Sequence, residues 1–96
     1  MQELTPAEVA ERPIVDVREE HEWEHGHAVD AIHIPMSEIV ERLAEVPEGA
    51  AIICRSGARS SRVVAYLEQQ GVDAVNVAGG TAQWAADGRP MVGGVL

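Results

Sequence analysis

Short segments with the apolar pattern of strands alternate along the chain with segments that have the apolar spacing of helices. Runs of four to six residues that are rich in apolar side chains and bounded by turn residues predict strands at residues 14–17, 30–35, 50–53 and 74–77. Between these runs, apolar residues at helical spacing predict amphipathic helices, the longest at residues 60–70. The alternation favours an α/β fold, a small doubly wound parallel sheet with helices on both faces.

Capping and turn residues predict the remaining elements. Thr5 followed by Pro6 and Glu8 has the pattern of a capping box with proline in the first turn, which begins a helix. The other expectations are an edge strand at residues 1–4, helices at residues 37–44 and 81–86, and a loosely held tail at residues 91–96. No linker or repeat divides the sequence, so residues 1–96 are expected to form a single domain.

An acidic segment at residues 19–25 predicts a helix that ends at Gly26. His21 and His25 stand one helical turn apart on it, a spacing that can bind a metal ion. A third ligand would fall beyond the helix end and no fourth is evident, so we expect no metal site here. Trp23 is expected to pack into the core, because a large aromatic side chain gains most from burial.

Composition and charge narrow the classes of partner. The net charge of −9 argues against binding to nucleic acid or to an anionic membrane surface. The single cysteine permits no intrachain disulfide, and a reactive thiol suits a reducing compartment. The sequence begins without the basic and apolar regions of a signal peptide and contains no apolar run of membrane-spanning length, so we expect a cytoplasmic protein.

The cysteine lies where a buried strand meets a helix. Residues 50–53 lead into Cys54, and the following helix is expected to begin near Arg59 or Ser60. Backbone N–H groups between strand and helix lack intrahelical partners, so they can point inward and hold an anion, and Gly57 permits a positive φ there. Cations of the same segment strengthen the positive potential around the sulfur: Arg55, Arg59 and Arg62.

Such surroundings favour the thiolate form of Cys54. Lowering the pKa of a thiol from ~8.5 to ~6.5 raises the thiolate fraction near pH 7 about 25-fold, while a Brønsted slope of ~0.45 lowers intrinsic nucleophilicity about 8-fold. The net gain of about 3-fold is small. We therefore expect that the loop mainly holds an anionic donor and stabilises charge on the transferred atom.

The loop and its flanking motifs resemble those of a single-domain rhodanese, a sulfurtransferase. The match runs over about residues 4–92. The residues that carry it are the loop Cys54-Arg55-Ser56-Gly57-Ala58-Arg59-Ser60, the segment Ile14-Val15-Asp16-Val17-Arg18-Glu19, the pair Gly26-His27, the pair Gly79-Gly80, and Trp84. The resemblance implies a rhodanese-like fold with a parallel sheet of about five strands and helices on both faces.

The resemblance also implies an activity and a site. Cys54 would take a sulfane sulfur from a donor such as thiosulfate, become a persulfide, and pass the sulfur to a thiol or to cyanide. The acceptor could be a small molecule or another protein, and the covalent persulfide would replace any cofactor. The residues expected to bind the donor are Arg55, Ser56, Gly57, Ala58, Arg59 and Ser60.

Other functions remain open from the residues alone. A cysteine-dependent phosphatase usually has five residues between cysteine and arginine, and the loop here is one residue shorter between Cys54 and Arg59. An arsenate reductase of the same fold, or a binding or carrier module without turnover, would also fit the fold. A thiol–disulfide oxidoreductase is disfavoured because Cys54 has no second cysteine beside it.

Three further polar residues lie near the expected site. Asp16 and Arg18 follow at the carboxyl end of the first buried strand, where ligands bind in parallel sheets. We expect them to form a structural ion pair, because charges beside a cleft often belong to structural networks. His33 is expected to be a hydrogen-bonded strand residue outside the site.

Overall fold

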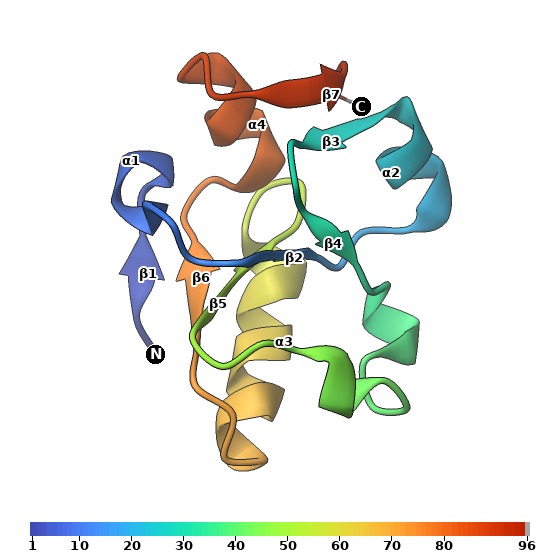
Figure 1. Cartoon of the computed structure of the whole chain (residues 1–96), viewed down its shortest axis with the longest axis vertical. Coiled ribbons are helices and arrows are strands. Elements are labelled where there is room, and N and C mark those ends of the chain that lie inside the picture. The colour runs from blue at the N-terminus through green and yellow to red at the C-terminus, as the bar shows by residue number, and fades with distance from the viewer. Residues whose placement is uncertain (96) are drawn as a thin grey trace.

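A computed structural model describes residues 1–95 of the chain. Within that part, five strands form one parallel sheet in the order β1-β6-β5-β2-β4 (Figure 1). The strands of this sheet are β1 (Glu3–Leu4), β2 (Ile14–Asp16), β4 (Ile32–His33), β5 (Ala50–Ile53) and β6 (Ala74–Val77). The predicted α/β fold is confirmed, and the strand that precedes Cys54 lies at the centre of the sheet.

Helices and short 3₁₀ turns connect these strands. They are α1 (Pro6–Val9), α2 (Glu20–His25), η1 (Met36–Glu38), η2 (Leu43–Glu45), α3 (Ala58–Gln69) and α4 (Gly80–Ala86). At the start of α1 the Thr5 backbone N–H donates to the Glu8 carboxylate at 2.9 Å, as a capping box requires. The helix ends at Val9, because Ala10 directly after it takes a positive φ of 54° and leaves the helical conformation.

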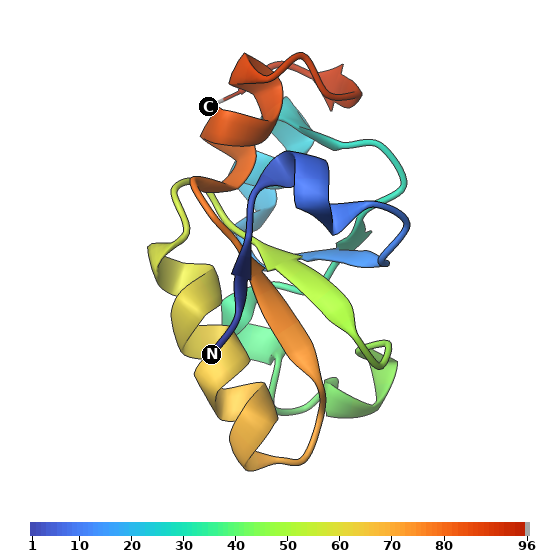
Figure 2. The same ribbon diagram turned by 90° about the vertical axis from the view of Figure 1, so that its left-hand side faces the viewer.

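Both faces of the sheet are covered, as predicted. Ala50 and Ile52 of β5 pack in one apolar cluster with α3, whereas Ala51 and Ile53 pack in a second cluster with Trp84 of α4. Figure 2 shows α3 on one side of the sheet and α1 on the other. Burial on both faces explains why the β5 sequence is an unbroken apolar run instead of an alternating one.

A second, two-stranded sheet was not predicted. Strand β3 (Gly26–Ala28) pairs antiparallel with β7 (Met91–Gly93). The expectation of a loose tail is therefore corrected for Met91–Gly93, and Leu96 lies outside the described residues. A Cβ at Gly26 would overlap the backbone of Gly94, so the approach of the two segments requires a glycine at that position.

The predicted helix at residues 37–44 is also corrected. The structure has the separate turns η1 and η2 there. A helix would have needed Ile39, Val40 and Leu43 on one buried stripe, but Val40 is 64% exposed. With so little apolar surface to bury, the segment forms single turns instead of a continuous amphipathic helix.

Candidate active site

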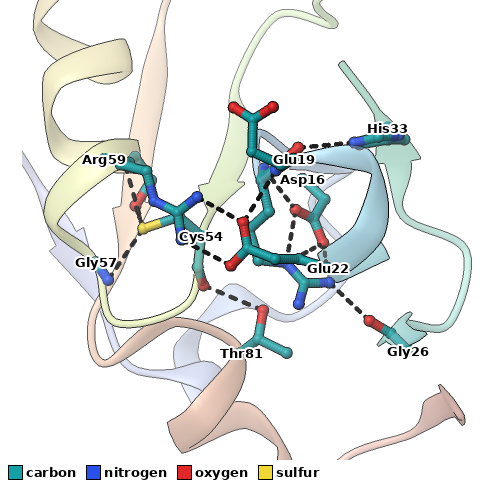
Figure 3. A network of polar contacts seen from close by, with 11 residues as sticks. Asp16, Glu19, Glu22, Gly26, His33, Cys54, Gly57, Arg59 and Thr81 are labelled. Carbon is teal, nitrogen blue, oxygen red and sulfur yellow. Dashed lines mark hydrogen bonds and ion pairs between the residues drawn. The ribbon is translucent and has the colours of Figure 1, made fainter. Parts of the chain in front are cut away.

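Cys54 directly follows β5, at the carboxyl edge of the parallel sheet. Its sulfur accepts hydrogen bonds from the backbone N–H groups of Gly57 (3.2 Å) and Ser60 (3.3 Å). The Ser60 hydroxyl lies 3.3 Å from the same sulfur. The convergence of backbone donors expected from the sequence is present, and Figure 3 shows the sulfur enclosed by the loop.

The sulfur is more deeply buried than expected for a reactive thiol, since Cys54 is only 1% exposed. Burial raises the pKa of the Cys54 thiol, but hydrogen bonds from the loop and the first turn of α3 act in the opposite direction and outweigh burial. The net pKa of the thiol lies below its usual value. A loop of this kind can stabilise a thiolate, or a negative charge on an atom bonded to the sulfur.

Gly57 turns the chain from the loop into α3. It is the N-cap of this helix and has a left-handed φ of 105°, which non-glycine residues rarely adopt. The helix begins at Ala58, slightly earlier than predicted, so the amides of its first turn face the sulfur. Gly57 thus lets one short segment supply donors from both the loop and the helix start.

The N-terminus of α4 donates hydrogen bonds to backbone carbonyls of the loop. The backbone N–H and the hydroxyl of Thr81 both donate to the Cys54 carbonyl, at 2.7 and 3.1 Å, and the Ala82 N–H donates to the Arg55 carbonyl at 3.1 Å. A Cβ at Gly80 would overlap these two carbonyl-bearing residues, so the close approach requires glycine. Sequence reasoning noted the glycine pair but missed the role of Thr81.

The Arg59 side chain extends from the first turn of α3 to α2. Its guanidinium donates two hydrogen bonds to Glu22 of α2, at 2.7 and 2.9 Å (Figure 3). The Arg59 hydrogen bonds lower the pKa of Glu22 to about 2 against the opposing effect of burial, with further lowering by the Glu19 N–H and the nearby Arg18 charge. The sequence analysis did not identify Glu22, which is one of several acidic residues in the segment at residues 19–25.

Asp16 and Arg18 form a fully buried ion pair beneath this region. Both side chains have 0% exposure, and Arg18 donates to the Asp16 carboxylate through Nε and Nη2. Nη2 also donates to the Gly26 carbonyl at 2.7 Å, which links β2 to the start of β3. Within residues 1–95, Arg18 Nη1 is buried without a hydrogen-bond partner. The arrangement matches the expected structural ion pair.

His33 lies beside this network. It donates from Nε2 to the Arg18 carbonyl at 2.8 Å and stacks on the Trp23 ring at 4.7 Å. Trp23 also stacks on His27 at 3.5 Å and is only half-buried, so the expectation that it anchors the core is wrong. Stacking between flat rings replaces the apolar packing that its size suggested.

The predicted donor-binding residues differ in how far they are exposed. Gly57 and Ser60 are buried against the sulfur, and Arg59 is half-buried against Glu22. Arg55, Ser56 and Ala58 are exposed on the outer side of the loop. A small anionic donor approaching the sulfur would therefore meet this exposed group first.

Among residues 1–95, no group of three or more His, Cys, Asp and Glu side chains is placed to hold a metal ion. In the same range, every helix is too short or too polar to cross a membrane.

Comparison with known proteins agrees with this geometry. The family model of the rhodanese-like domain matches residues 2–87. A sulfurtransferase of Allochromatium vinosum is 43% identical over 82 residues, covering 82% of this chain and 77% of that protein. The thiosulfate sulfurtransferase GlpE of Actinobacillus pleuropneumoniae is 31% identical over 81 residues, covering 81% and 75%.

A solved structure supports the same assignment. The crystal structure of a rhodanese-related protein from Thermoplasma volcanium superposes with a TM-score of 0.89 at 33% identity, covering 96% of this chain and 98% of that one. Fold, loop and sequence similarity thus agree. The chain belongs to the rhodanese-like domain family.

Proposed function

We propose that this protein is a thiosulfate sulfurtransferase that carries sulfur as a persulfide on Cys54. The observation that supports it most is the sulfur of Cys54, held by the N–H groups of Gly57 and Ser60 at the start of α3. Relatives named as sulfurtransferases, one of them a thiosulfate sulfurtransferase, support the class of reaction. The proposed donor is thiosulfate, and the proposed acceptors are a thiol or cyanide.

In the first step, the Cys54 thiolate attacks the outer sulfur of thiosulfate. A bond forms between Cys54 Sγ and this sulfur, the sulfur–sulfur bond of thiosulfate breaks, and sulfite leaves with the electron pair. The exposed Arg55 and the loop N–H groups hold the anionic sulfonate during the attack. The outer sulfur of the resulting persulfide then carries the negative charge.

In the second step, an acceptor thiolate attacks the outer sulfur of the persulfide, and the Cys54 thiolate leaves. The N–H groups of Gly57 and Ser60 stabilise the departing thiolate, as they do in the resting site. Cyanide can replace the thiol as acceptor, giving thiocyanate. Neither step needs a cofactor, because cysteine itself carries the sulfur.

Arg59 takes a different role from Arg55 in this proposal. Because both of its Nη atoms donate to Glu22, its charge is largely neutralised, and its main effect is to hold the first turn of α3 against α2. It is therefore a positioning residue for the loop. Direct binding of the donor is assigned to Arg55 and to the backbone.

The test is turnover of reduced protein with thiosulfate and cyanide, followed as thiocyanate, for the wild-type chain and for Cys54→Ser. We expect turnover that is lost completely in Cys54→Ser, because a hydroxyl at this position cannot form the persulfide. Turnover that survives in Cys54→Ser would overturn the mechanism. No turnover with thiosulfate or mercaptopyruvate, together with hydrolysis of a phosphate ester, would favour a phosphatase, and inactivity in both assays a binding module.

A further inference from the structure

The Ser60 hydroxyl lies between two groups that can each accept its proton. Its Oγ is 3.3 Å from the Cys54 sulfur and 2.5 Å from Oδ1 of Asn76, a residue of β6. Ser60 and Asn76 both have 0% exposure, so solvent does not supply a further partner. A hydroxyl has a single proton, and it can donate to only one of these groups at a time.

The orientation of the Asn76 amide decides which group receives the proton. Asn76 Nδ2 donates to the Glu3 carboxylate at 2.8 Å and to the Gly57 carbonyl at 3.1 Å. Both partners are acceptors only, so the nitrogen must face them and Oδ1 must face Ser60. Since two oxygens at this separation repel each other unless a proton lies between them, the Ser60 proton points to Asn76.

This arrangement leaves the lone pairs of Ser60 Oγ for the sulfur. The neutral thiol can donate its S–H proton to them, whereas the thiolate cannot receive the Ser60 proton unless Asn76 Oδ1 loses it. A buried amide oxygen without a donor is unfavourable, so this exchange is opposed. The thiolate then depends on the backbone N–H groups of Gly57 and Ser60.

We propose that Asn76 is a positioning residue that keeps the Ser60 hydroxyl proton away from the Cys54 sulfur. Under the proposed function, this restraint keeps the sulfur a stronger nucleophile, because the nucleophilicity of a thiolate falls as its basicity falls. Asn76 therefore balances the loop, whose backbone donors act in the opposite direction on the basicity of the sulfur.

Other charged groups around Cys54 must be separated from this effect. Arg55 adjoins it in the loop, Arg59 lies on α3 with Glu22 of α2 as its partner, and Glu3 of β1 contacts Asn76. Their charges act on the sulfur whether or not Ser60 has a hydroxyl group. A double-mutant cycle between positions 60 and 76 removes these contributions.

The experiment is a pH titration of thiolate absorbance in the reduced full chain, with Cys54→Ser as the blank, for wild type, Asn76→Leu, Ser60→Ala and the double variant. Leucine keeps the approximate size of asparagine but cannot accept the proton. We expect Asn76→Leu to lower the pKa of Cys54 by about one unit or more, since the freed hydroxyl then donates to the thiolate. In the Ser60→Ala background, Asn76→Leu should leave the pKa nearly unchanged.

An unchanged or raised pKa of Cys54 in Asn76→Leu would overturn the proposal. So would a decrease in the pKa of Cys54 that is equally large when Asn76→Leu is made in the Ser60→Ala background. If Asn76→Leu fails to fold by circular dichroism, Ser60→Ala alone decides. The proposal expects little change in the pKa of Cys54, whereas a hydroxyl that already donates to the thiolate predicts an increase of about one unit. The titration uses no sulfur donor, so it can fail or succeed independently of the sulfurtransferase assay.

Discussion

Two ion pairs lie close to the loop, and they differ in burial and in what they connect. Asp16–Arg18 is fully buried, joins residues two positions apart, and reaches the Gly26 carbonyl. Glu22–Arg59 is 33% exposed on its arginine side and joins α2 to the first turn of α3 across 37 positions. The first pair fixes the scaffold below the loop, and the second fixes the loop itself.

The difference shows why similar charges near a site need different tests. Removing one partner of a buried pair leaves a desolvated charge, so the effect appears mainly in stability. A partly exposed pair contributes less to stability, because water stabilises either partner when the other is removed. Its effect should appear in the loop and in how stability varies with pH.

The largest effect is expected for the buried pair. Asp16→Ala should lower the free energy of unfolding by about 3–5 kcal/mol, because it leaves Arg18 charged and buried without its carboxylate. Urea unfolding followed by circular dichroism measures this change. If Asp16→Ala lowered the free energy of unfolding by less than Glu22→Gln does, burial would not determine which ion pair contributes more to stability.

A smaller effect is expected for the pair at the loop. A double-mutant cycle of Glu22→Gln and Arg59→Met should give a coupling energy of about 1–2 kcal/mol, between the values for exposed and buried pairs. Methionine keeps the packing of the arginine stem, so the cycle isolates the charge interaction. No coupling would mean that the two side chains do not hold α2 and α3 together.

The same coupling should depend on pH in a defined direction. Pairing with Arg59 lowers the pKa of Glu22 from the usual value near 4.5 to about 2. The stabilisation from this ion pair is therefore complete above pH 4.5 and is lost as the pH falls toward 2. We expect the coupling energy to fall by about half or more between pH 7 and pH 3. An equal coupling at both pH values would contradict the proposed charge pairing.

The smallest effect is expected for an exposed control. Arg42 donates to Glu38 and Glu45 on the surface, and these two glutamate side chains are 48% and 52% exposed, whereas Glu22 is only 9% exposed. Because solvent screens such contacts, Arg42→Ala should leave the midpoint of urea unfolding close to the wild-type value. A loss as large as that of Asp16→Ala would mean that the number of hydrogen bonds, and not burial, ranks the ion pairs.

Local sequence signals were enough to predict the centre of the fold and the loop. The apolar run of β5, the glycine at position 57 and the amphipathic pattern of α3 all act within one short segment. The backbone donors around Cys54 follow from this local order, because a strand that runs into a helix leaves the amides of its first turn unpaired. These features could therefore be placed without knowledge of distant contacts.

Contacts between distant segments could not be predicted in the same way. Glu22 belongs to an acidic helix and shows no signal that it would pair with Arg59 of α3. The pairing of β7 with β3 depends on where α4 directs the chain, and Trp23 is positioned by two histidine rings. Each depends on tertiary packing, which overrides local preference.

The most direct test of the account is the mass of the intact protein after incubation with thiosulfate. We expect the reduced wild-type chain to gain the mass of one sulfur atom and to lose it again when cyanide or a thiol is added. The Cys54→Ser variant should show no gain in mass. This result would establish Cys54 as the sulfur carrier. An unchanged mass with thiosulfate and with other sulfane donors, in protein that remains folded and reduced, would contradict it.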